Sequence, residues 1–323
     1  MPFCQVIVDI NHTDVDHVFT YRVPKGLAVC PGMRVHVPFG PRKLEGVVVE
    51  MTEECDLPPE RVKDVCGTLE DYPAVLPPLL ALAKDIQKSS FCTLAVALRL
   101  MFPAQMRGQR IHEKQQEVAV LTVAPDVLGQ VIAAQVRAPK RAKVLRALAD
   151  APEMELTTAA LRETVGDCRD ALNALCKMGF VKLEKRETLR RPYGAMERLS
   201  RQDPKLTRQQ EDVLAELLPA VERGKGEFLL YGVTGSGKTE VFIRAVRHAA
   251  QQGKTAIVLV PEIALTPQMV SWFRSRFGED AAVLHSRLSP GERYDEWRRI
   301  RRGDVRVVIG ARSAIFAPLE NVG

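Results

Sequence analysis

Gly232-Val-Thr-Gly-Ser-Gly-Lys-Thr239 is the stretch that decides the fold of the C-terminal part of the sequence. It fits the pattern G-x-x-x-x-G-K-[ST], in which glycines let backbone N–H groups curl around a β-phosphate. The apolar run 228–231 precedes the stretch as an expected strand, and a helical pattern follows it. That helix would point its positive end at a bound nucleotide. The alternative is a glycine-rich turn with an exposed lysine, which the place of the motif between an expected strand and an expected helix disfavours.

The motif predicts which residues bind nucleotide and which act in catalysis. Lys238 would reach the β- and γ-phosphates, and the Thr239 hydroxyl would bind Mg²⁺; both are candidate catalytic residues. About twenty residues upstream, the Gln210 amide could read the two hydrogen-bonding edges of adenine. The full expected ATP-binding set is Gly232, Val233, Thr234, Gly235, Ser236, Gly237, Lys238, Thr239 and Gln210.

Residues 205–323 read as an α/β lobe. The short apolar runs 228–231, 256–260, 281–284 and 305–309 are separated by helical segments. Such runs are typical of strands that are buried on both faces of a parallel sheet.

The first 105 residues are expected to form a small β-domain with a helical appendage. Apolar runs with a period of two lie at 5–10, 19–23, 33–37 and 46–49, and proline and glycine punctuate them. Between residues 76 and 100 the apolar spacing becomes helical.

Residues 106–190 predict a winged-helix module. Helices are expected at 140–149, from Thr157 or Thr158 through Leu161, and at 169–178, where Gly179 ends the last one. A basic strand follows at 180–186. A three-helix protein-docking domain is the alternative. Residues 191–204 are charged, contain proline and lack periodicity, so they are expected to be a linker.

Composition sets the broad class. The 323 residues carry a net charge of +6, and 46% of them are hydrophobic. The net charge is −3 over residues 1–105, +5 over 106–200 and +4 over 201–323. No run approaches the roughly 18 to 20 apolar residues of a membrane span. The N-terminus shows no secretion signal, and the seven cysteines form no C-x-x-C pair. We therefore expect a cytoplasmic protein without disulfides.

Several motifs together resemble one family. Leu206-Thr-Arg-Gln-Gln210 is similar to the adenine-reading motif of superfamily 2 helicases. Residues 259–268, Leu284-His-Ser286 and Ile309-Gly-Ala-Arg-Ser313 resemble consecutive lobe-one motifs of the PriA family of bacterial primosomal replication-restart DNA helicases. Phe19-Thr-Tyr-Arg-Val-Pro24 and residues 34–40 are similar to the opening of that family's domain for the 3′ end of a nascent strand.

The resemblance implies a multidomain fold. It consists of a β-barrel-like 3′-end-binding domain (1–105), a winged helix (106–190), a linker (191–204) and an incomplete RecA-like P-loop lobe with a parallel sheet (205–323). It also implies DNA-binding residues: Phe19, Thr20, Tyr21, Gly40 and Lys63 for the terminal nucleotide, and Thr266, Arg312 and Ser313 for the phosphate backbone. Well-known family members have Asp where this chain has Thr20, so recognition of the 3′-OH would lack a charge-assisted hydrogen bond.

Other observations leave alternatives open. Phe19 and Tyr21 share a strand face, so at least one is expected in the core. Arg312 could contact DNA or pair with an acid. The basic run 298–302 is expected to be a solvated helix face, and His12, Asp14, Asp16 and His17 are expected to be solvated side chains rather than a metal site.

The expected activity is that of an ATP-dependent 3′–5′ helicase that recognises branched forks and starts primosome assembly. Expected partners are branched and single-stranded DNA, primosome proteins and single-stranded-DNA-binding protein, with no membrane. The family's acidic Asp-Glu-Glu-His box and its Zn²⁺-binding second lobe are expected beyond residue 323, so we expect this chain to be truncated and inactive. A non-catalytic DNA-binding scaffold and another DNA-translocating P-loop ATPase remain alternatives.

Overall fold

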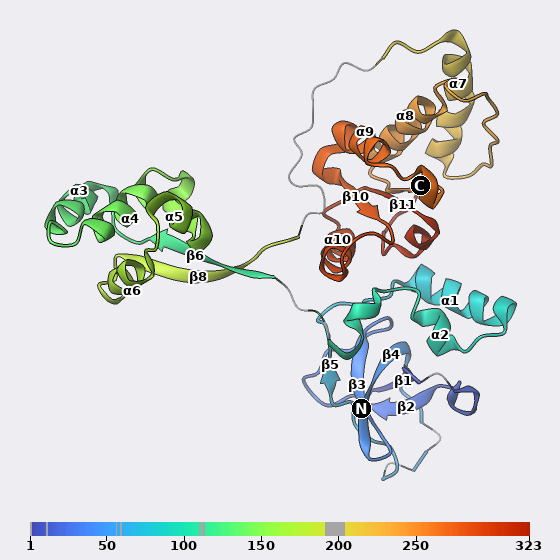
Figure 1. Cartoon of the computed structure of the whole chain (residues 1–323). Coiled ribbons are helices and arrows are strands. Elements are labelled where there is room, and N and C mark those ends of the chain that lie inside the picture. The colour runs from blue at the N-terminus through green and yellow to red at the C-terminus, as the bar shows by residue number, and fades with distance from the viewer. Residues whose placement is uncertain are drawn as a thin grey trace. The chain divides into compact units, whose positions relative to one another are not determined.

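The computed structural model describes residues 2–10, 12–55, 57–58, 60–109, 111, 114–190 and 204–323. The chain divides into two compact units, of which the second is drawn in green in Figure 1. One unit contains residues 1–111 and 191–323, and the other contains residues 112–190. The expected linker, 191–204, lies outside the described residues except for Pro204. No helix in the described part of the chain is long and apolar enough to cross a lipid bilayer.

The N-terminal sheet is antiparallel. Its strands are β1 (Phe3–Val8), β2 (Phe19–Arg22), β3 (Arg34–Phe39), β4 (Arg42–Thr52) and β5 (Gly67–Thr68), in the order β2-β1-β4-β3-β5. Alternate residues of these strands, including Val6, Val8, Val35 and Val37, are almost completely buried in one core. This is the outcome expected from period-two patterning, because alternate side chains leave a strand on opposite faces.

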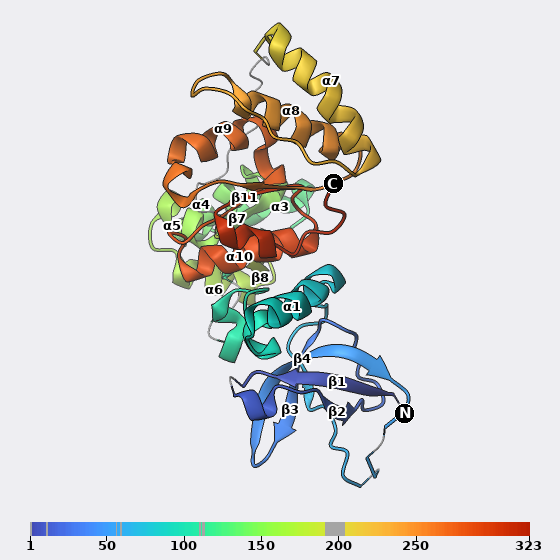
Figure 2. The same cartoon turned by 90° about the vertical axis from the view of Figure 1, so that its right-hand side faces the viewer.

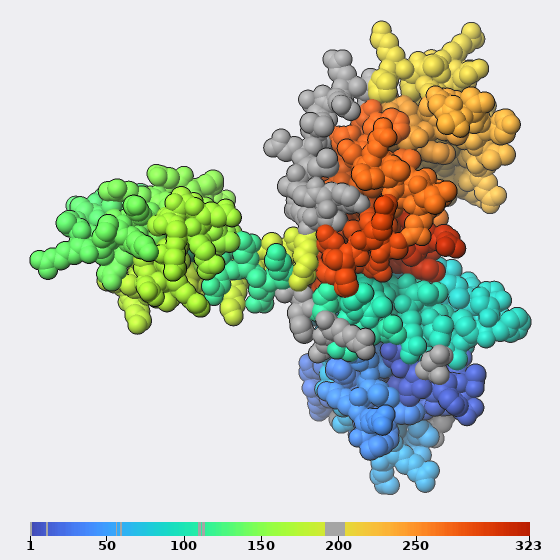
Figure 3. Space-filling model, in the orientation of Figure 1, coloured from blue at the N-terminus to red at the C-terminus, as the bar shows by residue number. Residues whose placement is uncertain are grey.

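Two helices cover this sheet, as Figure 3 shows in teal over blue. They are α1 (Pro77–Ser90) and α2 (Leu94–Leu98), followed by the 3₁₀ turns of residues Ala104–Gln109. The single helical stretch expected over 76–100 is therefore broken. Phe91 has φ of +50°, which ends α1, and the Thr93 hydroxyl accepts a hydrogen bond from the Val96 N–H and caps α2.

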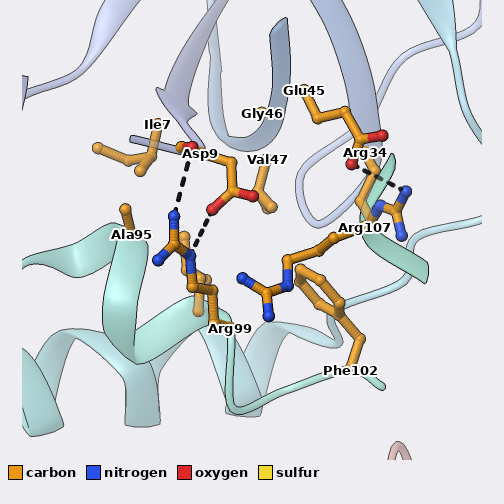
Figure 4. Close-up of a pocket in the computed structure, with 11 residues that line it drawn as sticks. Ile7, Asp9, Arg34, Glu45, Gly46, Val47, Ala95, Arg99, Phe102 and Arg107 are labelled. Atoms are coloured by element: carbon orange, nitrogen blue, oxygen red, sulfur yellow. Dashed lines mark hydrogen bonds and ion pairs between the residues drawn. The ribbon is translucent and has the colours of Figure 1, made fainter. Parts of the chain in front are cut away.

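An ion pair and several hydrogen bonds attach the appendage to the sheet, and Figure 4 shows the ion pair between Arg99 and Asp9. The Arg99 Nε lies 2.6 Å from Asp9 Oδ1, and Arg34 donates to the Met106 carbonyl at 2.9 Å. Glu45 accepts from the Gly108 N–H at 2.9 Å. Asp16 contributes as well, since its two carboxylate oxygens accept from the Leu94 N–H at 2.7 Å and the Gln87 amide at 2.9 Å. The expectation that Asp16 is merely solvated is wrong.

The second unit combines a small sheet with four helices. Strand β6 (Gln115–Leu121) pairs antiparallel with β7 (Glu155–Thr157) and β8 (Val181–Glu187), and the order is β7-β6-β8. The helices are α3 (Pro125–Ala134), α4 (Pro139–Ala149), α5 (Thr158–Val165) and α6 (Arg169–Lys177). Thr157 caps α5, and Gly179 has φ of +74°, as the sequence predicts. Strands β6 and β7 and helix α3 were not expected.

The C-terminal part has a parallel sheet, β10-β11-β9, formed by β9 (Ala256–Leu259), β10 (Ala281–Leu284) and β11 (Val307–Gly310). Helices α8 (Lys238–Gln251) and α9 (Pro267–Phe277) pack on one face, and α10 (Pro290–Arg302) packs on the other. Figures 1 and 2 show this layering from two sides. Helix α7 (Arg208–Arg223) packs against α8.

The strand expected at 228–231 does not form. A strand needs a neighbour for its N–H and C=O groups, and this segment pairs with none of the described strands. Leu229 and Tyr231 are 90% and 93% exposed. On the outer edge of β9, pairing among the described residues is limited to the residue before the strand, where Thr255 donates to the Asn321 carbonyl and accepts from the Gly323 N–H, both at 2.9 Å, on either side of Val322.

Helix α10 corrects the interpretation of the basic run 298–302. Arg298 and Arg299 are 2% and 3% exposed, whereas a solvated face would leave them open. Arg299 pairs with Glu296 at 2.7 Å, and Glu296 accepts from the Val283 N–H of β10 at 3.0 Å. Only partial exposure remains at Arg301, and Arg302 is exposed. The helical spacing was correct, but a neighbouring element covers the face.

That neighbouring element is the segment around Tyr72. The Arg301 Nε donates to the Pro73 carbonyl at 2.7 Å, and the Arg301 guanidinium lies 5.6 Å from the Tyr72 ring centroid. Trp297, 3% exposed, joins the core cluster of α1 and α2. Burial beside these groups raises the pKa of Tyr72 to about 12.

We expect Trp297→Ala to destabilise the chain by about 3–5 kcal/mol, because it removes a large aromatic side chain from a closed core. Urea denaturation followed by circular dichroism measures this change. Arg312→Ala, at an exposed position, is the control and is expected to change stability by no more than about 0.5 kcal/mol. A wild-type midpoint for Trp297→Ala would contradict the packing described for α10.

Candidate functional site

The phosphate loop forms a cradle at the start of α8. Gly235 and Gly237 have φ of +83° and +81°, values that favour glycine, and Gly237 is the residue before the helix. A Cβ at position 232 would lie 2.8 Å from Ser236 Oγ, so a larger residue there would displace this hydroxyl. The position of this glycine-rich loop at the start of α8 suits a triphosphate, because the N-terminal end of a helix favours negative charge.

Lys238 and Thr239 occupy the first turn of α8. The Lys238 ammonium donates to the carbonyls of Gly232 and Val233, at 2.6 and 2.9 Å. The ammonium is therefore held against the loop backbone, and its expected contact with phosphate stays a prediction. Glu240 is buried, and its carboxylate pairs with Arg244 at 2.9 Å and Arg276 at 3.5 Å. This carboxylate fixes α8 against α9.

Gln210 reaches the phosphate loop from α7. Its Nε2 donates to the Ser236 carbonyl at 3.2 Å, while its Oε1 accepts from the Thr207 N–H at 2.9 Å. With the Thr207 hydroxyl accepting from the Gln210 N–H, this completes a capping box. A Cβ at position 237 would collide with the Gln210 amide. The structure therefore brings Gln210 and the loop together, with both ends of the amide engaged by backbone groups.

Three further loops lie at the carboxyl edge of the parallel sheet. They contain Thr266, which caps α9 by accepting from the Met269 N–H at 3.2 Å, and Arg312 and Ser313, which follow β11. All three residues are exposed. Between them, the Ser286 hydroxyl bonds the Glu262 carboxylate, and Arg287 donates to the Leu265 carbonyl at 2.8 Å. The loops after β9 and β10 thus form one connected surface.

The sequence interpretation did not single out His285 or Arg293. His285 is 7% exposed, its Nδ1 accepts from the Arg287 N–H at 3.1 Å, and Arg293 donates to the carbonyls of His285 and Ser286. Burial, together with Arg287 and Arg293, lowers the pKa of His285 below 6.5. The motif Leu284-His-Ser286 was the signal for these residues, but it did not reveal that the histidine is buried.

The aromatic residues of β2 divide into core and surface. Tyr21 is 4% exposed, and its hydroxyl donates to the Pro38 carbonyl at 3.3 Å. Burial raises the pKa of Tyr21 to about 12. Phe19 is only partly buried, and its ring packs edge-on against Phe39 with centroids 5.2 Å apart. The expectation that at least one of the two belongs to the core is confirmed.

The other 3′-end candidates surround this strand. The Lys63 carbonyl accepts from the Arg22 N–H at 2.9 Å, so Lys63 lies beside β2 with its side chain exposed. Gly40, with φ of +56° and open space at its Cβ position, turns the chain after Phe39. Thr20 lies on the opposite face of β2 from Phe19 and Tyr21, because strand side chains alternate. One face of the strand therefore cannot present all three side chains.

Phe39 and His17 are aromatic neighbours that the sequence interpretation missed. The His17 ring lies 4.3 Å from the Phe19 ring, centroid to centroid. Phe39 lies directly before Gly40. Its place in the alternating pattern of β3 was the sequence signal that could have identified it as a neighbour of Phe19.

Comparison with known proteins agrees with this geometry. A family model described as a 3′DNA-binding domain (3'BD) matches residues 5–103, and one described as DEAD/DEAH box helicase matches residues 207–322. The chain is 32% identical along its whole length to the replication restart protein PriA of Bacillus subtilis (strain 168), covering 48% of that protein. It is 30% identical to PriA of Synechocystis, covering 46%. A stretch of 100 residues is 58% identical to PriA of Treponema pallidum.

The fold and the site define a helicase-type nucleotide-binding lobe joined to a DNA-binding domain. With these matches, the chain belongs to the PriA family of replication restart proteins. It spans about half the length of the curated relatives that it matches along its whole length.

We expect the C-terminal lobe to lose stability as the pH falls. The pKa of His285 in the folded chain lies below its ordinary value of 6.5, so the unfolded chain binds a proton at a higher pH than the folded chain does. The free energy of unfolding therefore decreases as the pH drops from about 7 to 5. Urea denaturation across this range measures the effect, with His285→Asn expected to reduce it and exposed His17→Asn to leave it unchanged. An undiminished pH dependence in His285→Asn would contradict this.

Proposed function

We propose that this chain is the DNA-end-recognition and nucleotide-binding part of an ATP-dependent 3′–5′ DNA helicase. The helicase recognises stalled or branched replication forks and starts primosome assembly for replication restart. One observation carries the proposal: the same chain holds a phosphate loop clasped by Gln210 and a partly open aromatic site on β2. The proposed domains are 1–105 for 3′-end binding, 106–190 for a winged helix, 191–204 for a linker and 205–323 for the first RecA-like lobe.

At the 3′-end site, Phe19 would stack on the terminal base. Lys63 would attract the last phosphate, and the open backbone at Gly40 would let the sugar approach closely. The backbone of Thr20, of Tyr21 or of both would hydrogen-bond to the terminal nucleotide, because the Tyr21 hydroxyl already donates to the Pro38 carbonyl. The acidic charge of residues 1–105 suits a pocket for one terminal nucleotide rather than a charged groove.

We expect a 3′-OH oligonucleotide to bind more tightly than the same strand ending in a 3′-phosphate, because residues 1–105 carry a net charge of −3 and a terminal phosphate adds further negative charge. Fluorescence anisotropy at fixed salt measures both affinities. Phe19→Ala should weaken 3′-OH binding about tenfold through loss of stacking. Thr20→Ala should have a smaller effect, and the neighbouring Val18→Ala is the matched control. Equal binding of both ends by the wild-type chain would rule out end recognition.

Residues 106–190 are proposed to contact duplex DNA as a winged helix. Helices α5 and α6 are joined by a short turn, and β6 and β8 form a ribbon beside them. Arg169, Asn173 and Lys177 lie exposed along α6. Such side chains suit phosphate contacts that set the register of a protein on DNA.

In the C-terminal lobe, Gln210 would read adenine after exchanging its bond to Ser236, and Lys238 and the loop amides would hold the phosphates. Thr239 would ligate Mg²⁺, which supplies charge neutralisation at the β- and γ-phosphates when bound. Thr266, Arg312 and Ser313 would contact the backbone of single-stranded DNA. The partners proposed from the family are primosome proteins and single-stranded-DNA-binding protein, in the cytoplasm.

We propose that this chain binds ATP without rapid turnover. Hydrolysis needs a group that positions the attacking water, and the carboxylate that follows Thr239, that of Glu240, is tied to Arg244 and Arg276. We expect no ATP turnover above background in a phosphate-release assay, with or without single-stranded DNA. Substantial DNA-stimulated turnover that Lys238→Ala abolishes would refute this.

A further inference from the structure

Phe91 is the most exposed large apolar side chain of the described residues, at 96%. It also occupies the left-handed region, with φ of +50° and ψ of 32°, as the residue that ends α1. Exposure means that the ring contributes no burial to folding, and the left-handed backbone is unfavourable for any side chain with a Cβ. Phe91 therefore does not stabilise the fold at this position.

Two other helices of this chain have a different residue at the equivalent position. Helices α7 and α10 also end on a left-handed residue, and there the residue is glycine: Gly224 with φ of +65° and Gly303 with φ of +79°. Glycine is the ordinary choice because it carries no Cβ. A phenylalanine in the equivalent place of α1 points to a use for the ring outside the fold.

The ring is held at a defined place relative to the 3′-end site. Asp16 binds Gln87 before Phe91 and the Leu94 N–H after it, at 2.9 and 2.7 Å. The residue after Asp16 is His17, whose ring packs on Phe19. The segment that bears Phe91 is thus tied on both sides to the segment that leads into β2.

The surroundings suit a nucleic-acid base. Lys88, Ser89 and Ser90 are exposed immediately before Phe91. The C-terminal end of a helix carries partial negative charge, which disfavours phosphate at this point and leaves the base as the part to contact. Bases of any identity stack on aromatic rings, so such a contact does not depend on the nucleotide sequence.

We propose that Phe91 is a stacking platform for an inner base of a single strand whose 3′ end occupies the Phe19 site. This rests on the proposed function, since it requires DNA at that site. Phe91 extends the contact beyond the terminal nucleotide and so favours a strand with several unpaired nucleotides before its end.

The test is anisotropy of the full chain with two 3′-OH probes, a short oligothymidylate and a thymidine dinucleotide. Phe91→Gly should bind the oligothymidylate about tenfold more weakly and the dinucleotide as well as wild type. Phe91→Tyr should keep wild-type affinity, whereas Phe91→Leu, which is apolar but cannot stack, should not. Urea midpoints of Phe91→Gly should equal or exceed wild type, because glycine relieves the backbone; a folding role predicts the reverse.

Glu153→Gly is the matched control, since Glu153 also has a positive φ, +57°, but lies in the other unit. It should leave binding to both probes unchanged. One outcome would refute the stacking proposal and leave the proposed function intact. In it, the wild type distinguishes 3′-OH from 3′-phosphate, but Phe91→Gly or Phe91→Leu binds oligothymidylate with wild-type affinity. The ring would then serve an apolar protein partner. If the wild type does not distinguish the two ends, the proposed function fails and the stacking proposal fails with it.

Discussion

Parallel pairing of β9, β10 and β11 is the constraint on which the C-terminal lobe depends. Because the three strands run in one direction, the loops that follow them leave from the same edge of the sheet. Thr266, Ser286 and Arg312 reach one edge for this reason, although they are far apart in the sequence. The hydrogen bond between Ser286 and Glu262 joins two of these loops directly.

A second constraint is the satisfaction of backbone groups at the phosphate loop. Lys238 and Gln210 both donate to carbonyls of the loop, so the cradle is shaped by side chains that would also contact nucleotide. In the N-terminal domain, Asp16 plays a comparable role by binding the N–H that starts α2. In each case a polar side chain sets the position of residues with a proposed part in binding.

Much of this organisation could be predicted from local patterns. Period-two runs located strands β1 to β4 of the N-terminal sheet but not β5, and Thr157 and Gly179 marked helix ends correctly. The run 228–231 had the composition of a buried strand, but pairing depends on neighbours that composition does not reveal. The run 298–302 had the composition of a solvated face, but Arg298 and Arg299 are buried and Arg301 contacts Pro73 and Tyr72, which are distant in sequence.

The sequence by itself determined the phosphate loop, because its glycines, Lys238 and Thr239 are dictated by local backbone geometry and phosphate chemistry. It also determined the family, through motifs whose residues are contiguous. Only the tertiary structure decided that Tyr21 is core while Phe19 is partly open, that Gln210 clasps the loop and that Asp16 holds the ends of two helices around Phe91. These depend on contacts between residues remote in sequence, whose partners are chosen by packing.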